Sequence, residues 1–170
     1  MTETKQQEIL HDWLTRHKGL FFKVVRAYAH TEEDRDDLFQ EITLQVWRSI
    51  PNFRGESAET TWIYRIAFNT AIRWHSKERK HQEGRQSMES APVLEVQSNH
   101  QDERLSWLYE QIGRLSEVEK SLCLLLLDGF SYKEMSNIVG ISESNVAVKI
   151  HRIKKYLQEQ SEKMTANNGI

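Results

Sequence analysis

The C-terminal part of the chain carries a basic stretch that could bind nucleic acid. Residues 141–157 hold four basic side chains and one acidic side chain, a local charge of +3 in a chain whose net charge is −2. At 100° per residue, a helix over this range has an apolar face and an opposite, polar face. The residues of that outward face are Ser144, Ala147, Val148, His151, Arg152 and Lys155.

We expect this outward face to bind DNA. Ser144 and Arg152 could read base edges, and Ala147 and Val148 could pack against thymine methyl groups. Two further cations, Lys154 and Lys155, would contact phosphates, which position a protein on the duplex without reading its sequence. The alternative is a solvated basic face on an ordinary helical hairpin.

The helices that would present this face have the pattern of a helix-turn-helix. Ser131 and Glu134 have the spacing of a capping box, which opens a helix. That short helix stops at Gly140, and Ile141-Ser142 begins the last helix. In a helix-turn-helix the second helix lies in the major groove. The predicted buried stripe of the last helix is Val146, Ile150, Ile153 and Leu157.

Charge is sharply segregated in the N-terminal part. Residues 31–41 hold six acids and one arginine, a net charge of −5, whereas residues 62–80 carry +4 among four aromatic side chains. Cations interleaved with aromatic rings are typical of single-stranded nucleic-acid binding, because bases stack on rings while the charges follow the backbone. An aromatic stripe can equally be core, and an acidic cluster can be a solvated helix face. If it is functional, the acidic cluster should bind a basic protein surface.

Composition excludes several classes of protein. The chain has 170 residues and one cysteine, Cys123, so it can form neither an internal disulfide nor a multi-thiolate metal site. The longest apolar run, Leu122 to Leu127, is far shorter than the roughly 20 residues needed to cross a bilayer. The first residues lack the features of a secretory signal, so we expect a cytoplasmic protein with no membrane insertion of its own. We expect no cofactor and no metal.

Two prolines and seven glycines, with no sustained alternation of apolar and polar residues, predict an all-α fold. Residues 81–103 are rich in polar side chains and contain Pro92, which predicts a flexible linker. It would join a helical domain over residues 1–80 to a second over 104–160, and 161–170 would form a tail. We expect three helices in the first domain: one striped from Ile9 to Tyr28, one from the Thr31 cap to about Ser49, and one from the Ser57 cap to about Lys80. The second of these helices carries the apolar residues Leu38, Phe39, Ile42, Leu44 and Val46. The third is expected to face inward with Ile63, Ile66, Ala67, Thr70 and Trp74.

These segments together resemble the bacterial sigma factors of the extracytoplasmic-function group. Residues 36–47, Asp-Asp-Leu-Phe-Gln-Glu-Ile-Thr-Leu-Gln-Val-Trp, are similar to that family's region 2.2. Residues 53–57, Phe-Arg-Gly-Glu-Ser, and 61–69, Thr-Trp-Ile-Tyr-Arg-Ile-Ala-Phe-Asn, are similar to regions 2.3 and 2.4. Residues 131–157 resemble region 4.2, so the likeness covers nearly the whole chain.

The resemblance implies a dissociable subunit of RNA polymerase with no catalysis of its own. Core RNA polymerase and promoter DNA would be its partners, and a separate anti-sigma protein would regulate it by covering these faces. The implied core-polymerase contacts are Asp37, Gln40, Glu41 and Trp47. The implied contacts to the melted minus-ten element, including a flipped base, are Phe53, Arg54, Trp62, Tyr64, Arg65, Asn69 and Arg73. The implied contacts to the minus-thirty-five duplex are Ser142, Ser144, Asn145, Val148, Lys149, His151, Arg152 and Lys155.

The chain departs from the family's pattern at two places. Glu59 and Thr60 stand where the family often has an apolar or aromatic residue. Ala147 and Val148 stand where it often has a basic residue and a serine, so base reading there would depend on methyl contacts and groove shape.

Two other classes of function stay open at this point. A stand-alone helix-turn-helix regulator would bind duplex DNA by itself, usually as a dimer, but it would have no use for the first domain. A metal-dependent nuclease would use acids such as Glu33, Asp36, Asp37 and Glu41, but none of the common catalytic sequence motifs is present.

Overall fold

The computed structural model describes residues 1–83 and 100–168, and within them every regular element is a helix. The predicted all-α class is therefore confirmed for the described residues. The chain divides into two compact units, Met1–Gln97 and Ser98–Ile170. The first contains α1 (Glu3–Arg16), α2 (Lys18–Tyr28), α3 (Glu32–Ser49), the short 3₁₀ helix η1 (Ile50–Asn52) and α4 (Glu59–Glu83). The second contains α5 (His100–Gly113), α6 (Glu117–Leu127), α7 (Tyr132–Val139) and α8 (Glu143–Asn168).

The helices bordering the predicted linker are longer than the sequence suggested. Helix α4 extends to Glu83 and α5 begins at His100, so both enter the range 81–103. Residues 84–99 of that range lie outside the described residues. Helix α8 likewise continues to Asn168, through most of the stretch expected to be a tail.

The first striped segment is two helices, and the prediction of one helix was wrong. The helix breaks at His17, whose φ of −114° and ψ of 26° lie outside the helical region. Gly19, a weak helix former, follows the break. The break lets Trp13 of α1 and Phe21 of α2 both pack into the core of the first unit. Periodicity missed it because Trp13 and Leu20, like Leu14 and Phe21, keep a seven-residue apolar spacing across His17.

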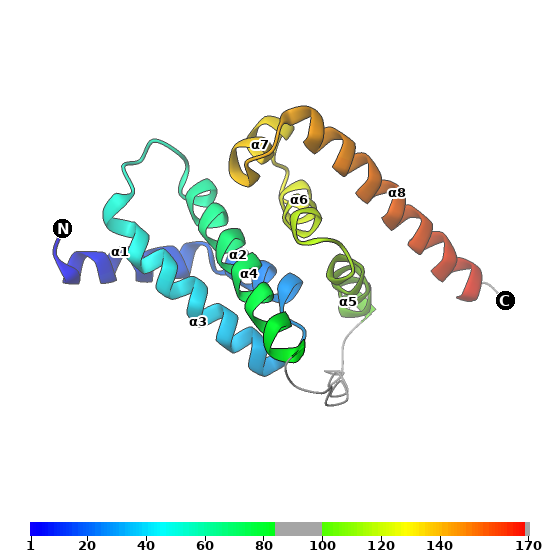
Figure 1. Ribbon diagram of the computed structural model, residues 1–170, viewed down its shortest axis with the longest axis horizontal. Helices are drawn as coiled ribbons and strands as arrows, with labels where there is room; N and C mark the ends of the chain where they lie inside the picture. Colours follow the sequence, from blue (N-terminus) through cyan, green and yellow to red (C-terminus); the bar gives the residue numbers. More distant parts are fainter. Residues whose placement is uncertain (84–99, 169–170) are drawn as a thin grey trace. The chain divides into compact units, whose positions relative to one another are not determined.

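Helices α3 and α4 form the centre of the first unit, where they lie side by side and antiparallel (Figure 1). Helix α3 begins as predicted at Thr31, whose hydroxyl accepts a 3.1 Å hydrogen bond from the backbone N–H of Asp34. Helix α4 begins at Glu59, two residues beyond its predicted cap at Ser57. The core residues of this pair are Leu38, Ile42, Val46, Ile63, Tyr64, Ala67, Phe68, Thr70, Ala71 and Trp74.

The second unit has the predicted helix-turn-helix. Ser131 and Glu134 form the capping box of α7, and Gly140 ends that helix with φ of 82°, a left-handed conformation that glycine adopts without strain. The hydroxyl of Ser136 donates a 2.5 Å hydrogen bond to the carbonyl of Ile141, which ties α7 to the turn. Val146, Ile150 and Ile153 of α8 are buried as predicted, and Leu157 is half-buried.

Candidate nucleic-acid and protein interfaces

The outer face of α8 presents the side chains that the sequence assigned to duplex DNA. Val148 is 49% exposed, and His151, Arg152 and Lys155 are exposed as well. Lys149 and Ala147 lie half-buried at the edges of this face. An exposed valine flanked by cations offers an apolar contact for a thymine methyl group next to phosphate-binding charges.

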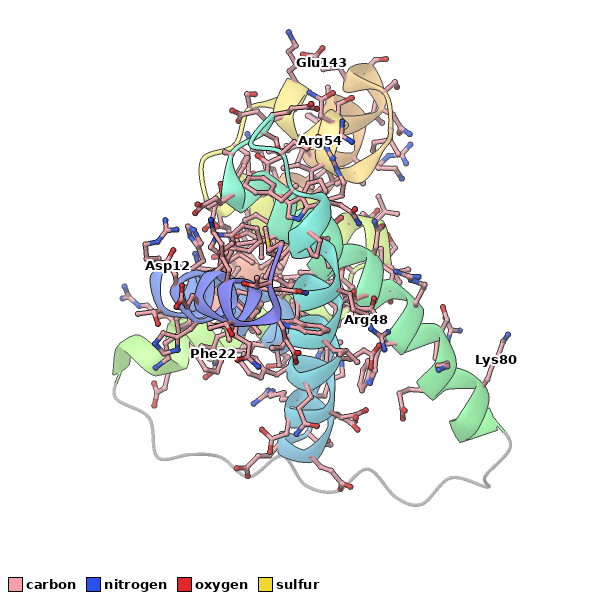
Figure 2. All side chains as sticks on the ribbon, turned by 90° about the vertical axis from the view of Figure 1, so that its left-hand side faces the viewer. Asp12, Phe22, Arg48, Arg54, Lys80 and Glu143 are labelled. Carbon is pink, nitrogen blue, oxygen red and sulfur yellow. The ribbon has the colours of Figure 1, made fainter. Side chains whose placement is uncertain are left out.

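The first turn of α8 is defined by a side-chain cap. The hydroxyl of Ser142 accepts a 3.1 Å hydrogen bond from the backbone N–H of Asn145 and lies 3.4 Å from the hydroxyl of Ser144. Ser142 is therefore the cap that sets where the helix begins. Ser144 and Asn145 are exposed in the first turn, which begins at Glu143. Figure 2 marks Glu143.

In the first unit, a loop over residues 53–58 leads into α4. Phe53, its first residue, is half-buried between Trp13, with ring centroids 5.2 Å apart at 86°, and Trp62, at 5.4 Å and 56°. The Trp62 Nε1 donates a 3.1 Å hydrogen bond to the hydroxyl of Ser49. Arg54 comes next and is exposed, and Gly55 turns the chain with φ of 73°. The loop is anchored at its aromatic first residue and displays a cation.

The outer face of α4 continues from this loop. Asn69 and Arg73 are exposed and Arg65 is half-buried, so three of the predicted minus-ten contacts are accessible. The Arg73 Nε donates a 3.2 Å hydrogen bond to the backbone carbonyl of Asn69, which keeps this arginine along the helix. Lys80 lies toward the far end of the same helix (Figure 2) and is exposed.

Three of the four aromatic residues on α4 belong to the core. Tyr64 is 1% exposed and stacks on Phe68 with ring centroids 5.1 Å apart, and Trp74 is buried too. The assignment of Tyr64 to the DNA surface is therefore corrected, because a ring without exposed area cannot stack on a base. Among the aromatic side chains of this helix only Trp62 keeps a partly exposed ring.

The face of α3 that carries the predicted protein contacts is acidic and partly apolar. Asp37 and Gln40 are exposed, whereas Glu41 and Trp47 are half-buried. The side-chain amide of Gln45 donates a 3.1 Å hydrogen bond to Glu41, and that of Gln6 donates a 2.6 Å hydrogen bond to the backbone carbonyl of Trp47.

The sequence interpretation missed Leu44 on this face. The sequence interpretation assigned Leu44 to the helix but to no contact surface, and its side chain is 39% exposed. It lies four residues after Gln40 and three before Trp47, which puts the three side chains on one side of the helix. That spacing was the signal that could have identified it.

A polar cluster joins the break between α1 and α2 to the start of α4. The guanidinium of Arg16 lies 2.8 Å from Oε2 of Glu59, and the His17 Nε2 lies 3.0 Å from the same oxygen. Arg16 also pairs with Asp12 one turn earlier. Hydrogen bonds from Arg16 and His17 lower the pKa of Glu59 below its ordinary value.

The single cysteine is part of the second core. Cys123 is buried, and burial raises the pKa of its thiol to about 11, so the thiolate that reacts or binds metal is not populated at neutral pH. In the part of the chain that the structure describes, no three His, Cys, Asp or Glu side chains are grouped as metal ligands. Among the described helices none has a span apolar and long enough for a bilayer.

Two models of one protein family match the two units. The Sigma-70 region 2 model matches residues 13–81, and the Sigma-70, region 4 model matches residues 105–157. The first match contains α2, α3, the loop at 53–58 and most of α4, and the second contains the helix-turn-helix.

Curated relatives resemble the chain over most of its length. It is 28% identical over 174 residues to the ECF RNA polymerase sigma factor SigX of Bacillus subtilis, covering 95% of this chain and 86% of the relative. It is 27% identical to the RNA polymerase sigma factor YlaC of the same organism, covering 98% and 99%. It is also 28% identical to the ECF RNA polymerase sigma-E factor of Escherichia coli K12, covering 75% and 73%.

Two solved structures share the fold. One is CnrH in complex with the cytosolic domain of CnrY, with a TM-score of 0.66, 18% identity and coverage of 92% of this chain and 90% of that one. The other is the sigma factor RpoE in complex with the anti-sigma factor NepR from Bartonella quintana, with a TM-score of 0.65, 19% identity and coverage of 95% and 98%.

Proposed function

The chain belongs to the sigma-70 family of RNA polymerase sigma factors, in its extracytoplasmic-function group, and from this premise we propose how its surfaces divide the work of starting transcription. A sigma factor binds core RNA polymerase and directs it to promoters. This division of work is supported by one observation: each family region coincides with one helical unit, and each unit has at least one charged face. The acidic face of α3 would bind protein, and the basic faces of α4 and α8 would bind DNA.

Core polymerase would bind along α3. Asp37, Gln40 and Glu41 supply polar contacts, and Trp47 supplies an apolar edge. The exposed Leu44, which lies between Gln40 and Trp47 on this face, extends this set, since apolar side chains surrounded by a polar rim are typical of protein interfaces.

The melted minus-ten strand would bind the loop at 53–58 and the outer face of α4. Arg54, Arg65 and Arg73 would follow its phosphates, and the amide of Asn69 would hydrogen-bond to a base flipped out of the stack. Phe53 and the partly exposed Trp62 would form the apolar side of this site. Because unstacking a base costs a few kcal/mol, a site built before DNA arrives lowers the cost of melting.

The minus-thirty-five element would bind α8 as duplex DNA in the major groove. Val148 and Arg152 would contact base edges near the middle of the exposed face, with Ser144 and Asn145 at its start. Lys149, His151 and Lys155 would contact the backbone, and Ser142 would cap the helix that presents them all.

The proposed function also implies a cellular compartment and a regulatory partner. We propose that the protein works in the cytoplasm, carries no catalytic step of its own and leaves phosphodiester chemistry to the polymerase. We also propose an anti-sigma partner, because RpoE, which shares this fold, is described in complex with the anti-sigma factor NepR. The stand-alone regulator is the weaker reading, since it leaves the region 2 match without a role.

The direct test mixes the purified protein with bacterial core RNA polymerase. We expect a stoichiometric complex on gel filtration and run-off transcripts from a subset of genomic fragments. A control sigma factor must bind the same core. Duplex binding by the protein alone, with no core complex beside a working control, would favour the regulator instead.

A further inference from the structure

The last turn of α1 contacts both ends of the loop that leads into α4. Trp13 packs edge-on against Phe53, where the loop begins. Arg16 and His17 follow Trp13 by three and four residues, and both bind the carboxylate of Glu59, where the loop ends and α4 begins. Residues at this spacing lie on one side of a helix, so the last turn of α1 and its C-cap His17 contact both ends of the loop. We call the contacts of Trp13 with Phe53, and of Arg16 and His17 with Glu59, the clasp.

The polar end of this clasp is well formed. Glu59 lies within 2.8 Å of Arg16 and 3.0 Å of His17 through Oε2, and its Oε1 accepts a 3.1 Å hydrogen bond from Arg16. His17 is only 17% exposed, so part of the cluster is shielded from water. Asp12 accepts a 2.9 Å hydrogen bond from the Arg16 Nε and orients the guanidinium. Charge-assisted hydrogen bonds of this kind are stronger than neutral ones.

The apolar end is equally fixed. The ring of Phe53 contacts two tryptophans, Trp13 from α1 and Trp62 from α4, and Trp62 is itself held by its hydrogen bond to Ser49. Between the two ends the chain displays Arg54 and turns at Gly55. The contacts of the loop with α1 therefore decide where Arg54 stands relative to α4.

Electrostatics alone gives Glu59 no favourable part in binding DNA. A carboxylate beside a basic DNA-binding face repels phosphates, so its removal should strengthen DNA binding if charge were its only effect. A role in holding the loop predicts the opposite sign, because an unfixed loop must be ordered each time it engages the melted strand.

We infer that Glu59 is a positioning residue for promoter melting: held by Arg16 and His17, it fixes the loop at 53–58 so that Arg54 meets the melted strand. This inference rests on the proposed function of the loop. It assigns the end of α1 a part in melting.

The test compares two alanine variants that remove one negative charge each. Glu59→Ala breaks the clasp, and Glu56→Ala removes an exposed carboxylate from the same loop and gives the electrostatic baseline. Amide hydrogen exchange over residues 53–60 of the full chain reports loop order. Permanganate reactivity of the holoenzyme, on a promoter found by run-off transcription, reports melting.

We expect Glu59→Ala to accelerate exchange in the loop and to slow melting, each by roughly threefold to tenfold, with core binding unchanged. Glu56→Ala should leave exchange unchanged and melt the promoter at least as fast as the wild type. Glu59→Gln, which keeps one carbonyl acceptor for Arg16, should be intermediate. Arg16→Gln breaks the same contact from its exposed side and serves if Glu59→Ala does not fold.

Two results would distinguish a failure of the positioning role from a failure of the proposed function. Melting by Glu59→Ala as fast as by Glu56→Ala, with normal core binding, would overturn the positioning role alone. Failure of the wild-type protein to bind core polymerase would overturn the proposed function on which the role rests, while hydrogen exchange would still show whether the clasp orders the loop.

Discussion

The indole Nε1 of Trp74 donates a 2.8 Å hydrogen bond to Oδ2 of Asp37, which joins α4 to α3. Trp74 is buried, whereas Asp37 is exposed on the acidic face. Asp37 therefore accepts a hydrogen bond inside the unit and is also a proposed polymerase contact. The two roles predict different effects of mutations at the two ends of the bond.

Trp74→Phe removes the donor and keeps most of the ring. We expect the first unit to lose about 1–2 kcal/mol of stability, because a hydrogen bond to a charged acceptor is lost. Core binding should be unchanged, since Trp74 is buried and only 9% exposed. Thermal unfolding of the full chain and a core-binding titration measure the two effects.

Asp37→Ala is the matched change at the exposed end. It should lower stability and weaken core binding together. If Asp37→Ala bound core polymerase as tightly as Trp74→Phe, Asp37 would serve only as the acceptor for the indole, and its proposed polymerase contact would be excluded.

Leu44→Ser tests the apolar centre of the α3 face. Leu44 is exposed, so stability should change by less than about 0.5 kcal/mol. Core binding should weaken about tenfold if the side chain fills a pocket on the polymerase. Met164→Ser on α8 is the control, since it makes a comparable exposed side chain polar in the other unit. Equal core binding by both variants would remove Leu44 from the interface.

The sequence predicted where helices begin better than it predicted how they break and pack against one another. Thr31 and Ser131 cap their helices as local patterns indicate, because an N-cap needs only contacts within one turn. The break at His17 was missed because a seven-residue apolar spacing continues across it. Long-range packing, which no local pattern contains, decides where such a break is favourable.

The same limit applies to the candidate sites. Most of the predicted outward face of α8 is exposed, including Val148, His151, Arg152 and Lys155, whereas Ala147 is half-buried. Helix α4 packs against both α2 and α3, and it buries Tyr64 and Phe68 as well as Trp74. Charge and aromatic content alone could not separate the rings of the core from those of the surface.

The acid stability of the first unit should depend on Glu59. The pKa of Glu59 in the folded protein lies below its unfolded value of about 4.3. The ionised side chain therefore stabilises the fold at pH values above about 4.3, and this stabilisation is lost as the pH falls through the folded pKa. Glu59→Gln should therefore be less stable than the wild type at pH 6, and the difference should shrink below about pH 4. Chemical denaturation at a series of pH values measures this, and a constant difference would show that the ion pair does not stabilise the fold.

Asn69→Ala tests the proposed base pocket on α4. The side chain is exposed, so the fold should tolerate the change. Open-complex formation should weaken roughly tenfold while core binding is kept, because the amide acts only on the flipped base. Fluorescence of a 2-aminopurine in the minus-ten element follows melting directly. Parallel loss of core binding and melting would instead indicate damage to the unit as a whole.

Arg152 and Lys155 are both exposed cations on α8, but we expect them to act differently on DNA. If Arg152 reads a base, Arg152→Ala should cost about 1–3 kcal/mol on the preferred promoter and relax selectivity at one base pair. Lys155→Ala should weaken binding about equally on all promoters and lower the salt dependence by about one unit of slope, because one phosphate contact is lost. Holoenzyme titrations on promoters substituted through the minus-thirty-five element, at several salt concentrations, separate the two patterns. Uniform weakening by Arg152→Ala would make it a second phosphate contact and leave Val148, Ser144 and Asn145 as the candidates for sequence reading on this face.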